Sequence, residues 1–319
     1  MNLNGIVRSL VILSLMVMAL SGCEKEPDPI RLGTNIWPGY EPLYLARAKG
    51  MLDSNRVRLV GYPSASEVIR AFRNHSLDAA SLTLDEVITL LDQKVPVKIV
   101  LVHDVSDGAD MIMARPGVEG MADLKGRTVG VESSALGAYV LTRALQINKL
   151  DLSELQVKHM DVNQHESAYR RGEIDAAVSF EPFSTRLQQM GARKIFSSHE
   201  LPGEIVDVLV VHEEVLEDHL EDLHHLHNSW FEALAYLKQE PEQSASIMSK
   251  RLQISEQEVL QSYQGILLPD EAENLAMLDG AQARLLASLE KLGTVMKRNG
   301  LIKNDISYRG ILAADAFER

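Results

Sequence analysis

The sequence predicts an α/β fold of two similar lobes, each a mostly parallel sheet flanked by helices, with two crossovers between the lobes. Three observations support this prediction. Short strands alternate with helices, which is typical of parallel sheets. The 319 residues suit two domains better than one. A pattern of residues also recurs along the chain, and each occurrence would belong to one lobe.

The recurring pattern has a constant spacing. Ala71–Arg73 resembles Ala168–Arg170, and Leu77–Ala80 resembles Ile174–Ala177, so that both pairs are offset by 97 residues (71 to 168 and 77 to 174). The apolar letters could coincide because both segments pass from a helix to a strand. The aspartate at the same register is harder to explain in that way, which favours two related lobes.

The first lobe is expected to comprise residues 30–103 together with 213–319. Its strands should lie at 30–36, 56–62, 77–82 and 97–102. Helices are expected at 42–52 and after Ser64 and Thr83, because Ser64–Glu67 and Thr83–Glu86 have the spacing of a capping box. The chain past 213 reads as helices near 215–238, 241–251, 255–264 and 272–298, which should pack back on this lobe.

The second lobe is expected to comprise residues 104–212. Its strands should lie at 127–133, 155–160 and 174–179, and its helices at 135–146 and 163–171. A return strand is expected at 203–211. The two crossovers would then lie near 103–107 and 204–212, and such a pair permits a hinge while limiting twist.

The first 22 residues have the features of a secretory signal peptide, since Arg8 precedes an apolar core at 10–20 that is too short to span a bilayer. Leu20–Cys23 resembles the lipobox of bacterial lipoproteins, in which the cysteine carries the lipid. Cys23 is the only cysteine of the chain, so we expect lipidation there and a tether over 23–29. An ordinary cleaved signal with a chance cysteine is the alternative. The net charge of −13 argues against nucleic acid as a partner.

A ligand site is expected where the parallel strands end, because open α/β sheets bind ligands beyond the carboxyl ends of their strands. Trp37 and Tyr40 would supply a flat wall, although either could be core packing. The acidic turns favour an amine, an amidine-like ring or a hydroxylated neutral ligand, unless their carboxylates cap helices or face solvent. The expected ligand-binding residues are Trp37, Gly39, Tyr40, Ser64, Ser66, Thr83, Asp85, Glu132, Ser133, Ser134, Gly137, Phe180 and Glu181.

No catalytic residue, cofactor or metal is expected. His165 and Glu166 are adjacent, but no nucleophile stands beside them. A cleft enzyme using them is therefore a minor alternative. The histidines between 219 and 227 could offer metal ligands, but a polar helix surface explains them as well.

The segments "RLGTNIWPGYEPLYLARAKGML", "YPSASEVIRAFRNHSLDAASLTLDE", "LKGRTVGVESSALGAYVLTRAL" and "SFEPF" resemble the solute-binding proteins of ABC importers for nitrate, sulfonates, taurine and thiamine-precursor pyrimidines. The resemblance implies a type II periplasmic binding protein, without catalysis, that closes on a small molecule and delivers it to an inner-membrane permease. In the anion-binding members, backbone N–H groups at helix starts hold the ligand, and Ser133–Gly137 is the matching loop.

We therefore expect a lipid-anchored monomer in the periplasm, or at the cell surface where there is one membrane. A clamp that reports ligand occupancy to a membrane sensor is an alternative that the sequence leaves open.

Overall fold

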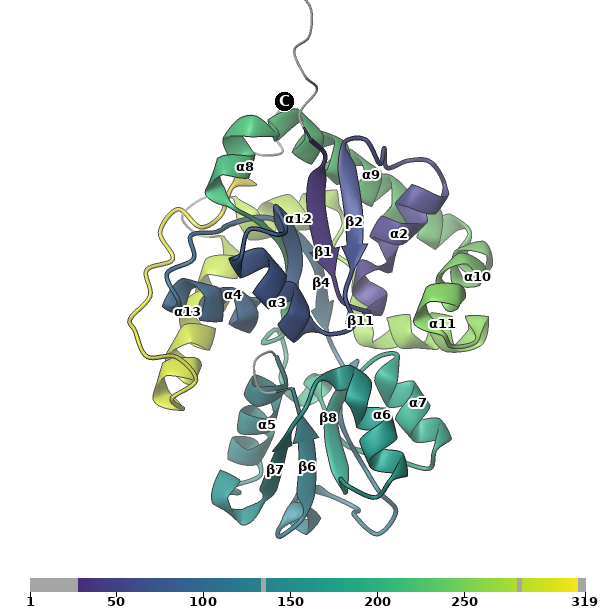
Figure 1. Ribbon diagram of the computed structural model, residues 1–319, viewed down its shortest axis with the longest axis vertical. Helices are drawn as coiled ribbons and strands as arrows, with labels where there is room; N and C mark the ends of the chain where they lie inside the picture. Colours follow the sequence, from purple (N-terminus) through teal and green to yellow (C-terminus); the bar gives the residue numbers. More distant parts are fainter. Residues whose placement is uncertain (1–27, 133–135, 280–282, 315–319) are drawn as a thin grey trace, which may run out of the picture.

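The computed structural model describes residues 28–132, 136–279 and 283–314. These form two lobes that lie end to end, each with its own sheet (Figure 1). The expected signal peptide, Cys23 and most of the expected tether lie outside the described residues, as do Ser133 and Ser134. No helix in the described ranges has the length and apolar character needed to span a membrane.

The first lobe contains a six-stranded sheet whose strand order is β11-β4-β10-β3-β1-β2. β1, β2 and β3 pair in parallel, whereas β10 and β11 join through antiparallel pairings. The strands are β1 (Ile30–Thr34), β2 (Val57–Gly61), β3 (Ala79–Thr83), β4 (Lys98–Ser106), β10 (Val206–Val211) and β11 (Ile266–Leu267). Its helices are α2 (Glu41–Ala48), α3 (Ala65–Arg73), α4 (Leu84–Asp92), α8 (Glu213–Asp218), α9 (Leu220–Gln239), α10 (Pro241–Leu252), α11 (Glu256–Ser262), α12 (Glu271–Leu278) and α13 (Arg284–Arg298).

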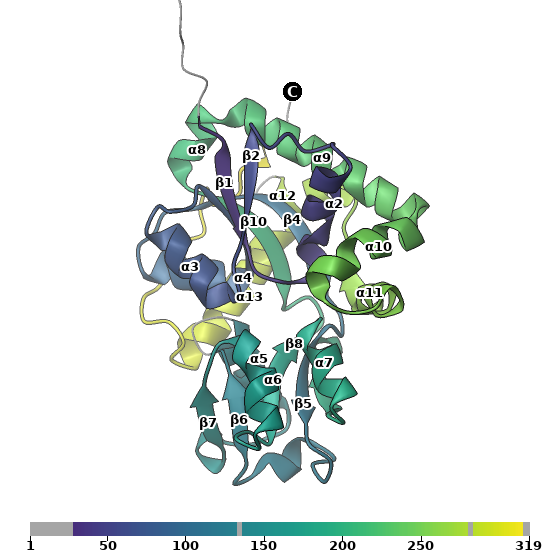
Figure 2. The ribbon, with the colours of Figure 1, turned by 45° about the vertical axis from the view of Figure 1, so that its right-hand side comes forward.

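Helices cover both faces of this sheet (Figure 2). Successive residues of β10 point to opposite faces, as in any strand. Val208 packs into the core shared with α3, α4 and α13, and Leu209 packs into the core shared with α2 and α9. The all-buried pattern of β10 follows from this three-layer arrangement.

The second lobe contains a five-stranded sheet in the order β7-β6-β8-β5-β9. Its parallel half is β6, β7 and β8, and β5 and β9 add antiparallel pairings. The strands are β5 (Asp110–Ala114), β6 (Thr128–Val131), β7 (Gln156–His159), β8 (Ala176–Phe180) and β9 (Arg193–Ser197), and the helices are α5 (Leu136–Ile147), α6 (Val162–Arg170) and α7 (Phe183–Gln189). The two-lobed α/β fold is thus confirmed, with mixed sheets whose parallel halves correspond to the alternating pattern.

The recurring sequence pattern corresponds to recurring geometry. Asp78 Oδ2 accepts a hydrogen bond from the backbone N–H of Arg31 at 2.8 Å, and Asp175 Oδ2 accepts one from that of Thr128 at 2.9 Å. Arg31 and Thr128 are themselves 97 residues apart (31 to 128). Each aspartate therefore ties the start of one parallel strand to the start of its neighbour, in both lobes.

Some elements differ from the expectation. The helix expected at 215–238 is divided at His219 into α8 and α9, and the one expected at 272–298 is divided into α12 and α13. β5, β9 and α7 were not expected from the sequence. β5 and β9 pair antiparallel at one side of the second sheet, outside the strand–helix alternation on which the prediction was based.

The chain crosses between the lobes twice, between Ser106 and Asp110 and between Ser197 and Val206. The two crossovers lie together, because the Ser198 hydroxyl is 2.8 Å from the Ser106 hydroxyl and accepts a hydrogen bond from the Gly108 N–H at 2.6 Å. β10, which follows the second crossover, pairs with β3 and β4 of the first sheet.

Candidate ligand-binding cleft

Two small cavities lie where the lobes meet, each of about 20 Å³. The first is lined by Asn35, Trp37, Tyr40, Ala65, Thr83, Glu86, Asp110, Leu136, Phe180 and Asp207. The second is lined by Ala65, Glu86, Asp110, Glu132, Leu136, Gly137, Val140, Val162, Val178, Ser179 and Phe180. Such a volume holds about one water molecule, so the lobes are closed on each other and must separate to admit a solute.

Aromatic residues from both lobes meet at this junction. The rings of Trp37, in the first lobe, and Phe180, in the second, lie edge to face with centroids 5.8 Å apart. Trp37 is only 4% exposed, and its indole N–H donates to Asp104 Oδ2 at 3.1 Å. Tyr40 donates its hydroxyl proton to Asp207. The turn that carries Trp37 and Tyr40 is therefore fixed by two buried carboxyls of the first sheet.

Gly39 is required by this packing. A Cβ at this position would overlap the Asp104 carboxylate and the Trp37 indole nitrogen. Gly39 thus lies behind the aromatic wall and allows the wall to approach β4, instead of facing the cavities.

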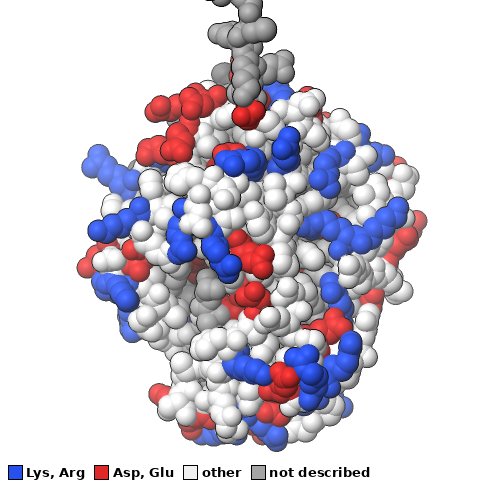
Figure 3. Space-filling view, in the orientation of Figure 1, with Lys and Arg blue, Asp and Glu red and all other residues white. Residues whose placement is uncertain are grey.

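Seven buried carboxyl groups surround the cavities, and we call them the acidic cluster. They are Asp85, Glu86, Asp104, Asp110, Glu132, Glu181 and Asp207. Burial raises the pKa of every member above its ordinary value, and for Asp110 it raises the pKa to about 7. Neither cavity has a lysine or an arginine among its described lining residues. Figure 3 shows acidic atoms on the surface at the level where the lobes meet.

Three members of the acidic cluster are adjacent to the crossovers. Asp104 and Asp207 are register partners on β4 and β10. Burial raises the pKa of both, and the charge of Asp104 adds to the rise at Asp207. The Asp104 side chain has a hydrogen bond with Asp207, whereas Asp110 Oδ2 is buried without a hydrogen-bond partner among the described residues. Buried polar atoms are nearly always paired, so the Asp110 oxygen indicates a place for a donor that is not part of the protein.

Glu132 and Glu86 each cross the junction to the start of a helix in the other lobe. Glu132 Oε1 accepts from the backbone N–H of Ser66 at 2.9 Å and from its hydroxyl at 2.6 Å, in the first turn of α3. Glu86 Oε1 accepts from the N–H of Leu136, the first residue of α5, at 3.3 Å. One backbone N–H at each of these two helix starts is thereby occupied by a carboxylate of the protein itself.

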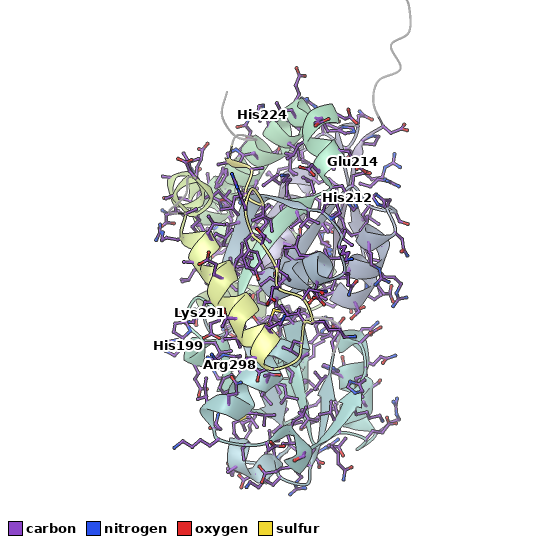
Figure 4. All side chains as sticks on the ribbon, turned by 90° about the vertical axis from the view of Figure 1, so that its left-hand side faces the viewer. His199, His212, Glu214, His224, Lys291 and Arg298 are labelled. Atoms are coloured by element: carbon purple, nitrogen blue, oxygen red, sulfur yellow. The ribbon has the colours of Figure 1, made fainter. Side chains whose placement is uncertain are left out.

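A second set of contacts closes the junction at the edge formed by α13. Lys291 Nζ lies 3.3 Å from Glu204 Oε1, and the Gln146 amide donates to Asn299 Oδ1 at 2.6 Å. Figure 4 shows Lys291 and Arg298 on α13 at the level of the junction, with His199 nearby, whereas His212, Glu214 and His224 lie in the first lobe away from it.

The structure brings six of the expected site residues to the cavities, namely Trp37, Tyr40, Thr83, Glu132, Gly137 and Phe180. Ser66 contacts Glu132, and Ser64 caps α3 by accepting from the Glu67 N–H at 3.3 Å. Asp85 accepts from the Thr83 hydroxyl and Glu181 from the Thr185 hydroxyl, each at 2.7 Å, and neither lines a cavity. Their role in ligand binding stays a prediction.

Glu86, Asp104, Asp110 and Asp207 were not among the expected site residues. Asp104 follows the apolar run "IVLV" in "KIVLVHDVS", and Asp207 stands within the otherwise apolar strand "VDVLVV". A carboxylate inside such a run is the signal that could have indicated them, because burial of an unpaired charge is costly.

His165 does not line either cavity, and burial lowers its pKa to about 4. Glu166 instead pairs with Arg170 at 2.7 Å. In the histidine-rich segment, His219 pairs with Asp222 at 3.0 Å, and His225 accepts from the Asp53 N–H at 2.9 Å. Among the described residues no three His, Cys, Asp or Glu side chains are placed to hold a metal ion together.

Known proteins share this sequence in part and this fold throughout. A binding protein of Brucella abortus is 36% identical over 85 residues, which are 27% of this chain and 26% of that protein. An aliphatic sulfonates-binding protein of Escherichia coli is 23% identical over 199 residues, 60% of this chain and 61% of that protein. The aligned parts thus span about a quarter and about three fifths of these relatives.

An alkanesulfonate-binding protein of Xanthomonas axonopodis, solved with bound MOPS, has the same fold, with a TM-score of 0.76, 15% identity, and coverage of 91% of this chain and 98% of that one. Residues 24–252 match the NMT1-like family. This range includes both crossovers and the lining residues of both cavities. The chain therefore belongs to the NMT1-like family.

Proposed function

We propose that this protein is the solute-binding component of an ABC importer, that it captures a small molecule between its lobes, and that it delivers this molecule unchanged to an inner-membrane permease. The observation that carries the proposal is the closed junction, where Trp37 and Phe180 meet from opposite lobes over cavities lined by both. The sulfonate-binding relatives in the same fold support a role in solute capture.

We further propose that the lobes divide at the crossovers. The first lobe would then comprise residues 30–106 and 206–314, and the second 107–205, which moves the boundary expected at 212 to the start of β10. Rotation about the paired crossovers would open the cavities and expose Trp37. Closure around a solute would remove it from water, so most of the affinity would belong to the closed state.

The lipid anchor at Cys23 and the periplasmic location are part of the proposal. Their support is the lipobox-like sequence Leu20–Cys23 and the absence of any other cysteine in the chain. Cys23→Ala should move the protein from the membrane fraction to the soluble periplasmic fraction. Retention of the variant in the membrane fraction would contradict the anchor.

Solute capture is tested at Trp37. We would screen the purified protein by thermal shift against taurine, nitrate, alkanesulfonates, thiamine pyrimidines and polyamines, since a solute that binds the native state raises the melting temperature as ln(1 + [L]/Kd). For any solute found, Trp37→Ala should weaken binding by at least about tenfold, and Trp37→Phe should retain most of it because the aromatic wall remains.

The same experiment separates capture from catalysis. Chromatography of the solute after incubation should recover it unchanged. Unaltered affinity in Trp37→Ala would contradict the proposed pocket, and turnover of the solute would contradict a binding function alone.

A further inference from the structure

The charge of the captured solute can be inferred from the residues at the junction. The starting observation is Asp110, the first residue of β5, which lines both cavities and is 3% exposed. Its Oδ2 atom has no hydrogen-bond partner among the described residues. Asp104, on β4, lines neither cavity and is engaged by Trp37 and Asp207. Asp110 therefore offers a buried acceptor at the place where both lobes meet.

The groups that face Asp110 provide no counter-charge. Asp104 and Asp207 face it from β4 and β10, Asp85 and Glu86 from α4, and Glu181 from the end of β8. Glu132 lines the second cavity beside it, and the neighbouring His103 is neutral because burial lowers its pKa to about 3. Arg251, on α10, is engaged by Glu41. The described charged groups that face Asp110 are therefore acidic, and Arg186 faces Glu181.

At two helix starts a carboxylate of the other lobe already accepts a hydrogen bond from the backbone. A helix start binds anions through its free N–H groups and its dipole. The Ser66 N–H of α3 donates to Glu132, and the Leu136 N–H of α5 donates to Glu86. A sulfonate or nitrate that used these two N–H groups would have to displace the carboxylates and would then lie among the remaining members of the acidic cluster.

From these contacts, and on the basis of the solute-binding function proposed above, we propose that the solute is a small organic cation whose protonated amine or amidinium group is held by Asp110 and Asp207, which both line the first cavity. A carboxylate oxygen without a partner accepts a hydrogen bond, and a primary ammonium or an amidinium supplies positively charged N–H donors, whereas a quaternary ammonium supplies none. The rings of Trp37 and Phe180 would pack against the carbon part of the same molecule and add a cation–π attraction.

The test uses isothermal titration calorimetry of the mature protein near pH 7.5 with putrescine, agmatine, choline, taurine and ethanesulfonate as probes. Putrescine or agmatine should bind with a Kd below about 1 mM. Choline, which carries one positive charge where putrescine and agmatine carry two and which has no N–H group, should bind at least about tenfold more weakly.

Proton exchange gives a readout that does not depend on a variant. A bound cation favours ionised carboxylates, so binding should release protons, seen as a dependence of the heat on the ionisation enthalpy of the buffer. A bound anion would have the opposite effect and cause proton uptake.

Asp110→Asn should weaken amine binding by at least about tenfold. Asp218→Asn, which makes the same charge change on the exposed surface of α8, is the matched control and should bind as the wild type does. Circular dichroism and a melting curve would verify that both variants are folded.

The outcomes separate this inference from the proposed function. Trp37-dependent binding of ethanesulfonate, an anion without an ammonium group, with proton uptake would overturn the cation assignment and leave solute capture in place. Failure of both putrescine and agmatine to bind, or full amine affinity in folded Asp110→Asn, would also overturn the cation assignment. Solute capture itself is judged only by whether some molecule, of either charge, binds in a Trp37-dependent way.

Discussion

The two ends of the parallel strands carry the same kind of side chain in opposite surroundings. At the amino ends, Asp78 pairs with Arg31 at 2.7 Å, and Asp175 lies 3.5 Å from Arg127. At the carboxyl ends, where the lobes meet, the acidic cluster has no described lysine or arginine on the cavity walls. The carboxylates at the amino ends are thus paired with arginines of the protein. Those at the carboxyl ends have no such partner on the described cavity walls.

The pKa values differ in the same way. Burial by itself would raise the pKa of Asp78, but the hydrogen bonds and charge of Arg31 outweigh it and lower the pKa below its ordinary value. At Asp110 burial is opposed only by a Ser106 hydrogen bond, and the pKa rises to about 7. Asp78 is half-buried and has a cationic partner, whereas Asp110 is fully buried and has no described cationic partner, so partner and burial together distinguish a structural carboxylate from one available to a ligand.

The largest expected effect comes from removing a neutralised carboxylate. Asp78→Ala should lower the free energy of unfolding by about 2–4 kcal/mol, because Arg31 loses bonds from its backbone N–H and its guanidinium. Asp175→Ala should cost less, about 1–2 kcal/mol, because its cationic partner is more distant. Urea denaturation would measure both, with exposed Asp218→Ala as the control. A larger loss for Asp175 than for Asp78 would break the proposed link between pairing and stability.

The acidic cluster should make the free energy of unfolding of the ligand-free protein depend on pH. Carboxyls with raised pKa keep their protons in the folded state after the unfolded state has released them, so the unfolded state binds fewer protons and stability falls as pH rises. Between pH 7 and pH 8 we expect a loss of at least about 1.4 kcal/mol, the value for one retained proton per pH unit.

This window avoids two opposing contributions. The buried histidines, whose pKa values are lowered, add stability as pH rises, but mainly below the unfolded value of about 6.5. They include His103, His165 and His227. Carboxyls with lowered pKa, such as Asp78, are ionised in both states well below pH 7. Melting curves would measure the slope, Asp110→Asn should flatten it, and a stability that rises from pH 7 to pH 8 would contradict the acidic cluster as described.

The smallest expected effects concern the two carboxylates that cross the junction. Glu132→Ala should weaken closure by about 1–2 kcal/mol and Glu86→Ala by about 1 kcal/mol, since the first accepts two hydrogen bonds and the second one. Small-angle scattering would report the opening as a larger radius of gyration. Glu271→Ala, at the exposed start of α12, is the control. If the variant that combines Glu132→Ala and Glu86→Ala has an unchanged radius of gyration, these contacts do not hold the lobes together.

Local patterns in the sequence predicted the parallel half of each sheet. Two of these patterns, the alternation of strands and helices and the capping box at Thr83, depend on residues that are near in sequence. The third, the aspartate found at both 78 and 175, depends on a direct repeat. The antiparallel additions β5 and β9 were missed because their pairing is between distant segments. The division between α8 and α9 at His219 was missed for another reason, because no glycine or proline marks the end of α8.

The site was predicted as a set of turns, and this located its aromatic wall. The sequence prediction did not include Asp104 and Asp207 among the site residues. In a strand buried on both faces, a single inward carboxylate is only one interruption of an apolar run. The prediction also did not foresee that Glu132 and Glu86 would serve the helices of the opposite lobes, since that depends on how the lobes dock.

The place of the three aspartates relative to the crossovers has a consequence for the order of events. Points near a rotation axis are displaced little when two bodies swing apart, and Asp104, Asp110 and Asp207 all adjoin the segments that Ser106 and Ser198 bring together. The contacts of Glu132 and Glu86 belong to elements outside those segments and would separate fully. Asp110 and Asp207 would therefore bind the charged group of the solute while the lobes are still open. Closure of the lobes would follow as a second step that encloses the bound solute.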